Sequence, residues 1–493
     1  MNKTRLVFSA IAIVLLSTLG LNAQNTVAPS DTFTKIEAYL SAGVANGFSG
    51  AMLVSSKGQV LLNKGYGIAN KDINTLNNPN TIFDIGSNTK QFTATAVLKL
   101  AEQGKLKVTD SLQAYFKELP ADKRHITIHQ LLTHSAGFVE SIGRDFDEIT
   151  EQDFFEQLFA SELLFESGSA YSYSNVGYSI LGKIIEMTSG QAYEAFLNTH
   201  LFTPAGMKQT GYLLPKWDTI QLARSYNRGV LDGPSTVRRY QETGDLTWHL
   251  KANGGINATQ NDMLLWYKAL KANKIITAQS LKNMMIPHAL APSGTYSYGY
   301  GWGVRESKGH GPRIAHNGSN GAFAHSLIWY PQQDLYIVFA TNSNSSKVEG
   351  LARVVEKMIL DPTYEPKPLQ NNIYFFTINY AAQNPTEKSK DLLLLLQQEY
   401  TDEFTNSGIL NTVGNFLLGN SENLPWALEF FKMNVNLYPD DGNLWDSLGE
   451  AYSIIKDNDN AIECFEKALE LKPEINCYWC ENSTNRLQEL SDK

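Results

Sequence analysis

Two polar residues three positions apart open a nearly continuous apolar segment of the chain. Ser87 and Lys90 begin "SNTKQFTATAVLKL" with the spacing S-x-x-K. On a helix, this spacing places both side chains on one face. Burial of the lysine favours its neutral form, and a neutral lysine beside a serine hydroxyl is a general base next to a nucleophile. The ordinary alternative is that Ser87 caps a helix and Lys90 is a surface charge.

The spacing by itself has little weight, because it occurs again at Ser453 and Lys456 inside a predicted helical repeat. What distinguishes Ser87 is its context. Residues 92–101 are apolar on most faces, which predicts a buried helix. Ser87 is expected at the start of this helix, where free backbone N–H groups can stabilise an oxyanion.

A second candidate motif is Tyr173-Ser174-Asn175. We expect the Tyr173 phenol, with a pKa lowered by nearby cations, to relay a proton to the leaving group and later to activate water. Asn175 would orient Lys90 and hold a substrate amide. The alternative is a loop of packed tyrosines.

A third candidate motif is His316-Asn317-Gly318, on a strand-like run. Gly318 would let a substrate backbone lie close to the strand. The N–H of Ser319 would be the second oxyanion donor. The alternative is a structural histidine on a strand.

The elements that position these motifs are predicted from apolar periodicity. Residues 49–70 read as two strands around a Lys57-Gly58 turn, and the middle of the chain is largely helical. Three strands follow from residue 313, and a helix covers 351–360. This order predicts one antiparallel sheet in which early and late strands meet. Three prolines in residues 361–368 predict a linker.

The C-terminal part carries the tetratricopeptide pattern, a repeat of 34 residues. An amphipathic helix with the sequence "DLLLLLQQEY" is expected before about two repeat units, which would present a concave surface to a peptide or protein. The residues that match are Trp445, Leu448, Gly449, Tyr452, Ala461, Phe465 and Pro473, with an earlier partial copy at Val413, Gly414, Ala427, Phe431 and Pro439.

Composition and the N-terminus limit the possible functions. The chain has 493 residues, is 43% hydrophobic and has a formal net charge of -9, which argues against binding to a nucleic-acid backbone. Residues 1–23 have the layout of a secretory signal peptide, with a membrane anchor as the alternative. Loss of its two basic residues, Lys3 and Arg5, takes -9 to -11. Cys477 and Cys480 would form a small disulfide or act as a redox pair.

The three motifs occur in the order S-x-x-K, Y-x-N and H-x-G, and the chain here resembles the serine β-lactamase and penicillin-binding protein superfamily. The resemblance covers about residues 36–360 and is closest to the branch with class C β-lactamases, DD-carboxypeptidases, esterases and D-aminopeptidases. It extends to "LLTHSAGF", "LFTPAGMKQTGY" and "GGINATQNDMLLW". It implies a three-layer α+β/α domain, an antiparallel sheet flanked by helices with a helical subdomain, followed here by an all-α tetratricopeptide-like domain.

The resemblance also implies a mechanism and raises one question about substrate. Ser87 would attack a carbonyl, Lys90 and Tyr173 would share the proton transfers, and the N–H groups of Ser87 and Ser319 would form the oxyanion hole. No metal or cofactor is required. Class C β-lactamases usually carry Lys-Thr-Gly where this chain has His316, which would supply a weaker, pH-dependent charge. Efficient β-lactam turnover is therefore not expected.

These observations predict a domain division and three functional hypotheses. The expected segments are a signal peptide at 1–23, a hydrolase domain at 24–361, a linker at 362–370 and repeats at 371–493. The leading hypothesis is a periplasmic or secreted serine hydrolase acting on D-amino-acid peptides, esters or, poorly, β-lactams. In the second, the chain is a catalytically weak scaffold whose repeats recruit a protein partner. In the third, the repeats cover the active site and select substrates.

Overall fold

The computed structural model describes residues 31–231, 235–244, 246–348, 350–419, 421, 423–473 and 477–491. The predicted signal peptide, residues 1–23, lies outside the described residues. Within the described ranges, no helix combines the length and the apolar character needed to cross a membrane.

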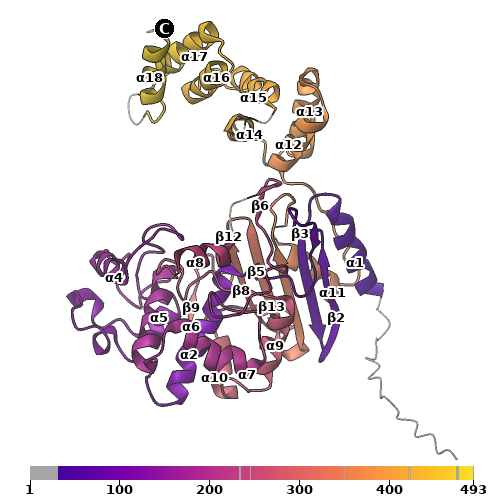
Figure 1. Ribbon diagram of the computed structural model, residues 1–493. Helices are drawn as coiled ribbons and strands as arrows, with labels where there is room; N and C mark the ends of the chain where they lie inside the picture. The colour runs from indigo at the N-terminus through magenta and orange to yellow at the C-terminus, as the bar shows by residue number, and fades with distance from the viewer. Residues whose placement is uncertain are drawn as a thin grey trace, which may run out of the picture.

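A single large antiparallel sheet organises the first part of the chain (Figure 1). Among the described residues it has eight strands in the order β2-β1-β14-β13-β12-β11-β10-β9. The strands are β1 (Gly50–Ser56), β2 (Gln59–Tyr66), β9 (Ala289–Leu290), β10 (Ser297–Tyr298), β11 (Gly303–Ser307), β12 (Gly311–Asn320), β13 (Phe323–Tyr330) and β14 (Leu335–Thr341). Strand β1 pairs with β14 from Gly50↔Thr341 to Ser56↔Leu335. The prediction that early and late strands meet is therefore confirmed.

The predicted hairpin between β1 and β2 is also confirmed. Ser56 pairs with Gln59 across the turn. Both central residues have positive φ, 49° at Lys57 and 78° at Gly58. Positive φ at both positions gives the turn the twist that two-residue hairpins need.

Helices cover both faces of this sheet. The N-terminal helix α1 (Asp31–Val44) and α11 (Leu351–Leu360) pack on one face, in an apolar cluster with Met52 and Ile337. The neighbouring residues in each strand, Leu53 and Val338, belong to the cluster on the other face. That cluster includes residues of α9 (Gln260–Lys271). The alternation of side chains along a strand thus produces the three layers that the sequence predicts.

A largely helical subdomain lies beside the sheet (Figure 1). Helix α2 packs against α5 within it, and its core is continuous with the sheet face that α9 covers. Its helices are α2 (Lys90–Glu102), α3 (Ile128–Leu132), α4 (Glu151–Ala160), α5 (Asn175–Ser189), α6 (Tyr193–Leu197), α7 (Thr203–Ala205), α8 (Thr236–Thr243) and α10 (Ala278–Met285). Short helical turns are η1 (Gly86–Thr89), η2 (Leu112–Ala114), η3 (Ala121–Lys123), η4 (Asn198–Phe202) and, on the sheet, η5 (Pro331–Gln333). The short strand pairs are β3 (Ile68–Asn70) with β4 (Thr75–Leu76), β5 (Phe83–Asp84) with β8 (Asn257–Ala258), and β6 (Tyr226–Asn227) with β7 (Val230–Leu231).

The C-terminal part is helical, as predicted. Its elements are α12 (Ile373–Gln383), η6 (Thr386–Lys388), α13 (Ser389–Glu399), α14 (Gly408–Gly419), α15 (Leu424–Leu437), α16 (Gly442–Ile454), α17 (Asn458–Glu470) and α18 (Cys480–Ser491). The pairs α14–α15 and α16–α17 pack in the same way. A Cβ at Gly414 would meet the Phe431 ring at 2.8 Å, and one at Gly449 would meet Phe465 at 2.7 Å. The Gly and Phe positions of the repeat thus allow the two helices of each pair to approach closely.

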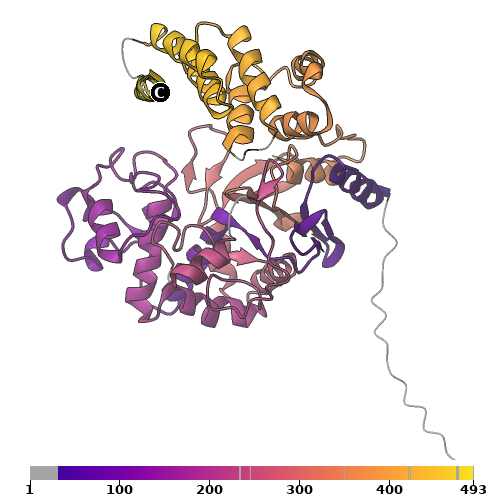
Figure 2. The same ribbon diagram turned by 45° about the horizontal axis from the view of Figure 1, so that its top comes forward.

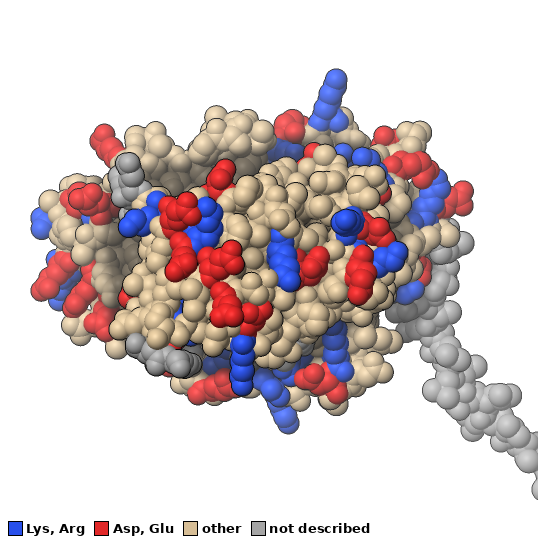
Figure 3. Space-filling view, turned by 90° about the horizontal axis from the view of Figure 1, so that it is seen from above, with Lys and Arg blue, Asp and Glu red and all other residues tan. Residues whose placement is uncertain are grey.

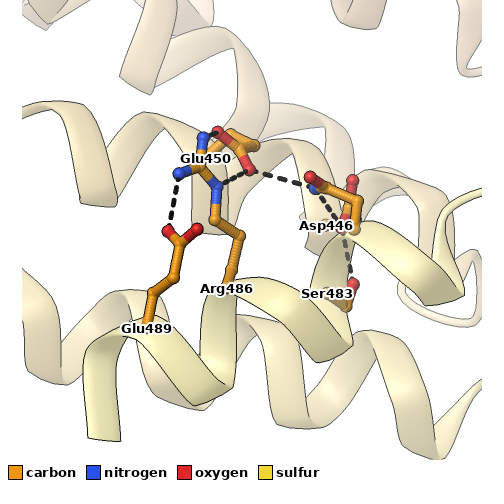
Figure 4. Close-up of polar contacts among 6 residues, drawn as sticks. Asp446, Glu450, Ser483, Arg486 and Glu489 are labelled. Atoms are coloured by element: carbon orange, nitrogen blue, oxygen red, sulfur yellow. Dashed lines mark hydrogen bonds and ion pairs between the residues drawn. The ribbon is translucent and has the colours of Figure 1, made fainter. Parts of the chain in front are cut away.

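Polar contacts attach the last helix, α18, to α16 (Figure 4). Arg486 makes a bidentate ion pair with Glu450, through Nε at 2.7 Å and Nη2 at 2.8 Å. The Ser483 hydroxyl donates to Asp446 Oδ1 at 2.5 Å. At the start of α18, Cys477 and Cys480 form a disulfide. The last helix is therefore held as a cap on the array.

Helix α12 and the turn after α13 contact the part of the chain that contains the large sheet (Figures 1 and 2). Lys347 forms an ion pair with Glu403 at 2.5 Å. The Arg228 guanidinium lies 4.1 Å from the ring centroid of Tyr374 on α12. Viewed from above, basic and acidic side chains are interspersed over the exposed face (Figure 3). The junction thus includes an ion pair and a cation–π contact.

Candidate functional site

Ser87 lies in a tight turn between strand β5 and helix α2. Gly86 has a φ of 49°, a left-handed conformation that glycine adopts without strain. The turn is closed by the Asn88 N–H, which donates to the Ile85 carbonyl at 3.1 Å. The structure corrects one expectation here, because α2 begins at Lys90 and Ser87 belongs to the preceding η1 turn. The left-handed glycine tightens the chain into a 3₁₀ turn before the α-helix can start.

The capping alternative for Ser87 is wrong. Neither η1 nor α2 has a side-chain cap hydrogen bond; the capping positions are Ile85 and Thr89. Ser87 is only partly buried, whereas its neighbours Asn88 and Thr89 are fully buried. Its hydroxyl is thus available to a substrate.

Lys90 is fully buried, at 0% exposure, and its amine contacts three oxygens. Nζ lies 3.2 Å from Ser87 Oγ, 2.7 Å from Asn175 Oδ1 and 2.7 Å from the Asn253 carbonyl. Among the residues that the structure describes, no carboxylate forms an ion pair with this amine. Burial lowers the pKa of Lys90 well below its usual range, against the opposing field of two more distant acids, Glu140 and Asp145. The site therefore favours a neutral amine that can accept a proton from Ser87.

Asn175 reaches Lys90 because helix α5 begins at this residue. Ser174 caps the helix, with its side chain accepting from the Gly177 N–H at 3.1 Å. The Asn175 N–H donates to the Glu140 carbonyl at 2.8 Å. These contacts fix the Tyr173–Asn175 segment beside Lys90, as the orienting role of Asn175 requires.

The Tyr173 ring lies 4.7 Å from Lys90 Nζ, measured to the ring centroid. The Tyr173 hydroxyl is buried near Ser87, and this proximity lowers the pKa of Tyr173 somewhat. The geometry of the contact is not that of a hydrogen bond. The expectation of a lowered pKa is wrong. Burial is the larger effect and raises the pKa of Tyr173 above its usual value. The nearby amine is itself desolvated, so it does not offset this effect.

Strand β12 brings His316, Gly318 and Ser319 to the same site. His316 Nδ1 lies 2.6 Å from the Asn317 carbonyl, and its Nε2 lies 2.9 Å from the Tyr298 hydroxyl. If Nδ1 donates to the carbonyl, Nε2 accepts from Tyr298. Desolvation is the larger cause that lowers the pKa of His316, and a charge on Lys90 would lower it further. Because the ordinary pKa of histidine already lies below 7, we expect His316 to be neutral near neutral pH.

Gly318 permits a close approach between two parts of the protein itself. A Cβ at Gly318 would lie 2.1 Å from the Ile85 carbonyl oxygen and 2.7 Å from the Ser87 nitrogen. A Cβ at Gly86 would lie 2.5 Å from the Ser319 nitrogen. The two predicted oxyanion donors, the N–H groups of Ser87 and Ser319, thus belong to backbone segments in direct contact.

Several residues near the site had no assigned role in the sequence analysis. His134 is buried among tyrosines, with ring centroids 4.3 Å from Tyr173 and 4.4 Å from Tyr298, and its Nδ1 accepts from the Ser174 N–H at 3.0 Å. Burial lowers the pKa of His134 well below its usual value. His134 lies in the segment "LLTHSAGF" and Asn253 directly precedes "GGINATQNDMLLW", two segments of the family resemblance. That resemblance is the sequence feature that could have pointed to these two residues. Tyr298 has no comparable motif.

The geometry defines a class of site, a serine beside a buried lysine, facing a strand that bears a second backbone N–H. The chain belongs to the beta-lactamase family, because the model described as Beta-lactamase matches residues 36–357, more than half of the chain. A tetratricopeptide repeat model matches residues 442–475.

Relatives and solved structures agree with this family. PbpX of Bacillus subtilis, which is named as a penicillin-binding protein, is 31% identical over 305 residues. The match covers 61% of this chain and 73% of the relative. Penicillin-binding protein 4* of Bacillus subtilis is 24% identical over 354 residues, covering 66% and 75%. The fold is shared with the octameric penicillin-binding protein homologue of Pyrococcus abyssi, with a TM-score of 0.59, 23% identity, and coverage of 71% and 81%. It is also shared with D-amino acid amidase of Ochrobactrum anthropi, with a TM-score of 0.56, 23% identity, and coverage of 68% and 100%.

Proposed function

We propose that this protein is a secreted or periplasmic serine hydrolase that forms an acyl-enzyme on Ser87. The observation that carries the proposal is Lys90, a fully buried amine 3.2 Å from the Ser87 hydroxyl, with a pKa lowered by burial. Lys90 takes the Ser87 proton as Oγ attacks the substrate carbonyl. The N–H groups of Ser87 and Ser319 stabilise the resulting oxyanion.

Tyr173 acts in this proposal as a proton donor rather than as a phenolate. Its raised pKa keeps the hydroxyl protonated near neutral pH. A protonated phenol beside Ser87 can pass its proton to the leaving group and recover one through Lys90, whose amine lies over the ring. Water then attacks the acyl group and releases it from Ser87.

The proposed substrates are D-amino-acid peptides or amides and esters, with β-lactams as poor substrates. His316 is neutral near pH 7, because its pKa is lowered to about 3. A substrate carboxylate therefore lacks the cation that a lysine at this position would supply. A fold shared with D-amino acid amidase is compatible with amide substrates.

A matched substrate series tests this proposal. We expect kcat/KM to be higher for a D-alanine p-nitroanilide or ester than for nitrocefin. The His316→Lys variant should raise nitrocefin turnover relative to the ester by adding a cation. Faster turnover of nitrocefin than of every ester and amide by the wild-type protein would contradict the substrate assignment.

A scaffold role is the second candidate, favoured by the tetratricopeptide match. In that case the repeats recruit a protein partner and the first part of the chain contributes little catalysis. Zero turnover over the whole substrate series, together with a partner captured only when residues 371–493 are present, would favour this role. Turnover abolished by Ser87→Ala would favour the hydrolase.

A further inference from the structure

A buried carboxylate connects the two chain segments that carry the proposed oxyanion donors. Asp84 ends strand β5 and is 1% exposed. Its Oδ1 accepts from the Gly86 N–H at 2.7 Å, and its Oδ2 accepts from Asn320 Nδ2 at 2.9 Å. Gly86 precedes Ser87 in the chain and Asn320 follows Ser319. One side chain thus contacts the residue adjacent to each donor.

These two segments touch through backbone atoms with no side chain between them. The space around Gly86 and Gly318 is too small for a Cβ, which would lie within 2.7 Å of the opposite segment's nitrogen in both cases. Backbone packing of this kind prevents closer approach but does not prevent sliding or separation. A hydrogen bond that crosses the contact, such as that between Asp84 and Asn320, therefore helps to set its geometry.

Stabilisation of the fold does not explain the charge on Asp84. Burial raises its pKa from 3.8 to about 6, although bonds to Gly86, Thr236 and Asn320 oppose the rise. As pH rises from 3.8 to about 6, the unfolded chain has released this proton while the folded state still holds it. In this range the group makes folding less favourable with rising pH. Near neutral pH the carboxylate is therefore a net cost to stability.

We propose that Asp84 is a positioning residue that fixes the separation of the Ser87 and Ser319 N–H groups through its bonds to Gly86 and Asn320. The inference rests on the proposed acyl-enzyme function. Oxyanion stabilisation depends on donors held in place before the charge develops. A small displacement of one donor weakens the transition state more than it weakens substrate binding.

The Asp84→Asn variant removes the charge and one of the two bonds. Asparagine can still accept from the Gly86 N–H, but its amide then faces the Asn320 amide, donor against donor. We expect kcat for p-nitrophenyl acetate to fall by roughly 10- to 100-fold, with KM changed by less than about threefold. The melting temperature should change little, because removal of a buried charge stabilises the fold while the contact between two amide donors destabilises it.

The reciprocal exchange provides a rescue. Combining Asp84→Asn with Asn320→Asp restores a carboxylate–amide bond with its direction reversed, and kcat should return to within about fivefold of wild type. Asp262→Asn is the matched control. Asp262 is also buried, has a raised pKa and accepts from two backbone N–H groups, of Lys208 and Gln209, but these lie in a loop distant in sequence from both donor segments. Its kcat should stay within about twofold of wild type.

The outcomes separate this inference from the proposed function. A wild-type protein that forms no adduct on Ser87 would overturn both. If the adduct forms and Asp84→Asn has wild-type kcat with a lowered melting temperature, Asp84 has only a structural role and the inference is wrong. A double variant no better than the single one would also overturn it.

Discussion

Serine and lysine stand three residues apart at two places in this chain, and the two places differ in the burial of the lysine and in the contacts that it makes. Ser87 and Lys90 lie in the turn and first residue of a buried helix, with the amine fully enclosed. Ser453 lies at the end of α16, and Lys456 follows it with an exposed side chain and a φ of 63°. Within the described part of the chain, Lys456 has no side-chain hydrogen bond like that of Lys90 to Asn175 and no cation–π contact like that of Lys90 with Tyr173. Chemistry at a S-x-x-K pair depends on burial of the lysine and on the partners it meets.

The largest expected effect separates the two serines. Ser87→Ala should lower turnover of an activated ester by roughly 10⁴-fold or more, because loss of a serine nucleophile removes the covalent pathway. Ser453→Ala should leave turnover unchanged. Steady-state kinetics on both variants measures the two turnover rates. An equal loss of turnover in the two variants would contradict the claim that only Ser87 is catalytic.

The two lysines should differ nearly as much. Lys90→Met should lower kcat by about 10²–10⁴-fold, the range for loss of a general base, whereas Lys456→Met should not change it. Lys90 has a folded pKa below its unfolded value of 10.5. The unfolded chain therefore binds more protons between these values, and this group increases stability as pH rises through that window.

Lys90→Met should abolish that part of the pH dependence without lowering the melting temperature. Wild-type kcat/KM should also fall as pH drops through the pKa of Lys90, since a protonated amine cannot accept the Ser87 proton. Melting curves and rate profiles, carried from pH 10 down to the lowest pH at which the protein stays folded, test both statements. A rate that shows no loss on acidification before the protein unfolds would contradict the role of Lys90 as a base.

Alanine substitutions at glycines of the two regions should affect different properties, catalysis in one region and stability in the other. Gly318→Ala places a methyl group against the Ile85–Ser87 backbone, and we expect a kcat loss of about 10²-fold. Gly449→Ala pushes against Phe465 and should destabilise the repeats by about 1–3 kcal/mol, partly offset by the better helix propensity of alanine. Kinetics and thermal unfolding of both variants distinguish the two. Reduced catalysis in Gly449→Ala would indicate coupling between the regions.

The smallest expected effect concerns the junction. Lys347 and Glu403 are both partly exposed, at 28% and 39% of their side chains. A double-mutant cycle with Lys347→Ala and Glu403→Ala should give a coupling of about 0.2–1 kcal/mol in unfolding and no change in kcat/KM. A large effect on kcat/KM would instead support the hypothesis that the repeats select substrates.

The sequence predicted the sheet and the repeats well because both depend on periodic patterns. The β1–β2 hairpin, the β12–β14 run and the Gly–Phe contacts of the repeats follow from alternation or spacing that a single segment displays. The predicted proximity of Lys90, Asn175 and His316 came from motif order and family resemblance, and the structure brings these residues together.

The protonation states of residues in the site could not be predicted from sequence patterns. The raised pKa of Tyr173 and the neutral form of His316 depend on how much water the surrounding helices exclude, which no local pattern reports. Asp84 gave no signal at all, since its two partners are known only once residues 84 and 320 are placed side by side. Long-range polar contacts of this kind require the folded structure.

Intact-mass analysis after incubation with a phosphonate ester and a fluorescent penicillin, followed by peptide mapping, tests directly whether Ser87 is the nucleophile. We expect one added group, located on the peptide that contains Ser87. This adduct should be absent in Ser87→Ala and retained in Ser453→Ala. Equal labelling of Ser87→Ala would contradict the central claim that Ser87 is the nucleophile.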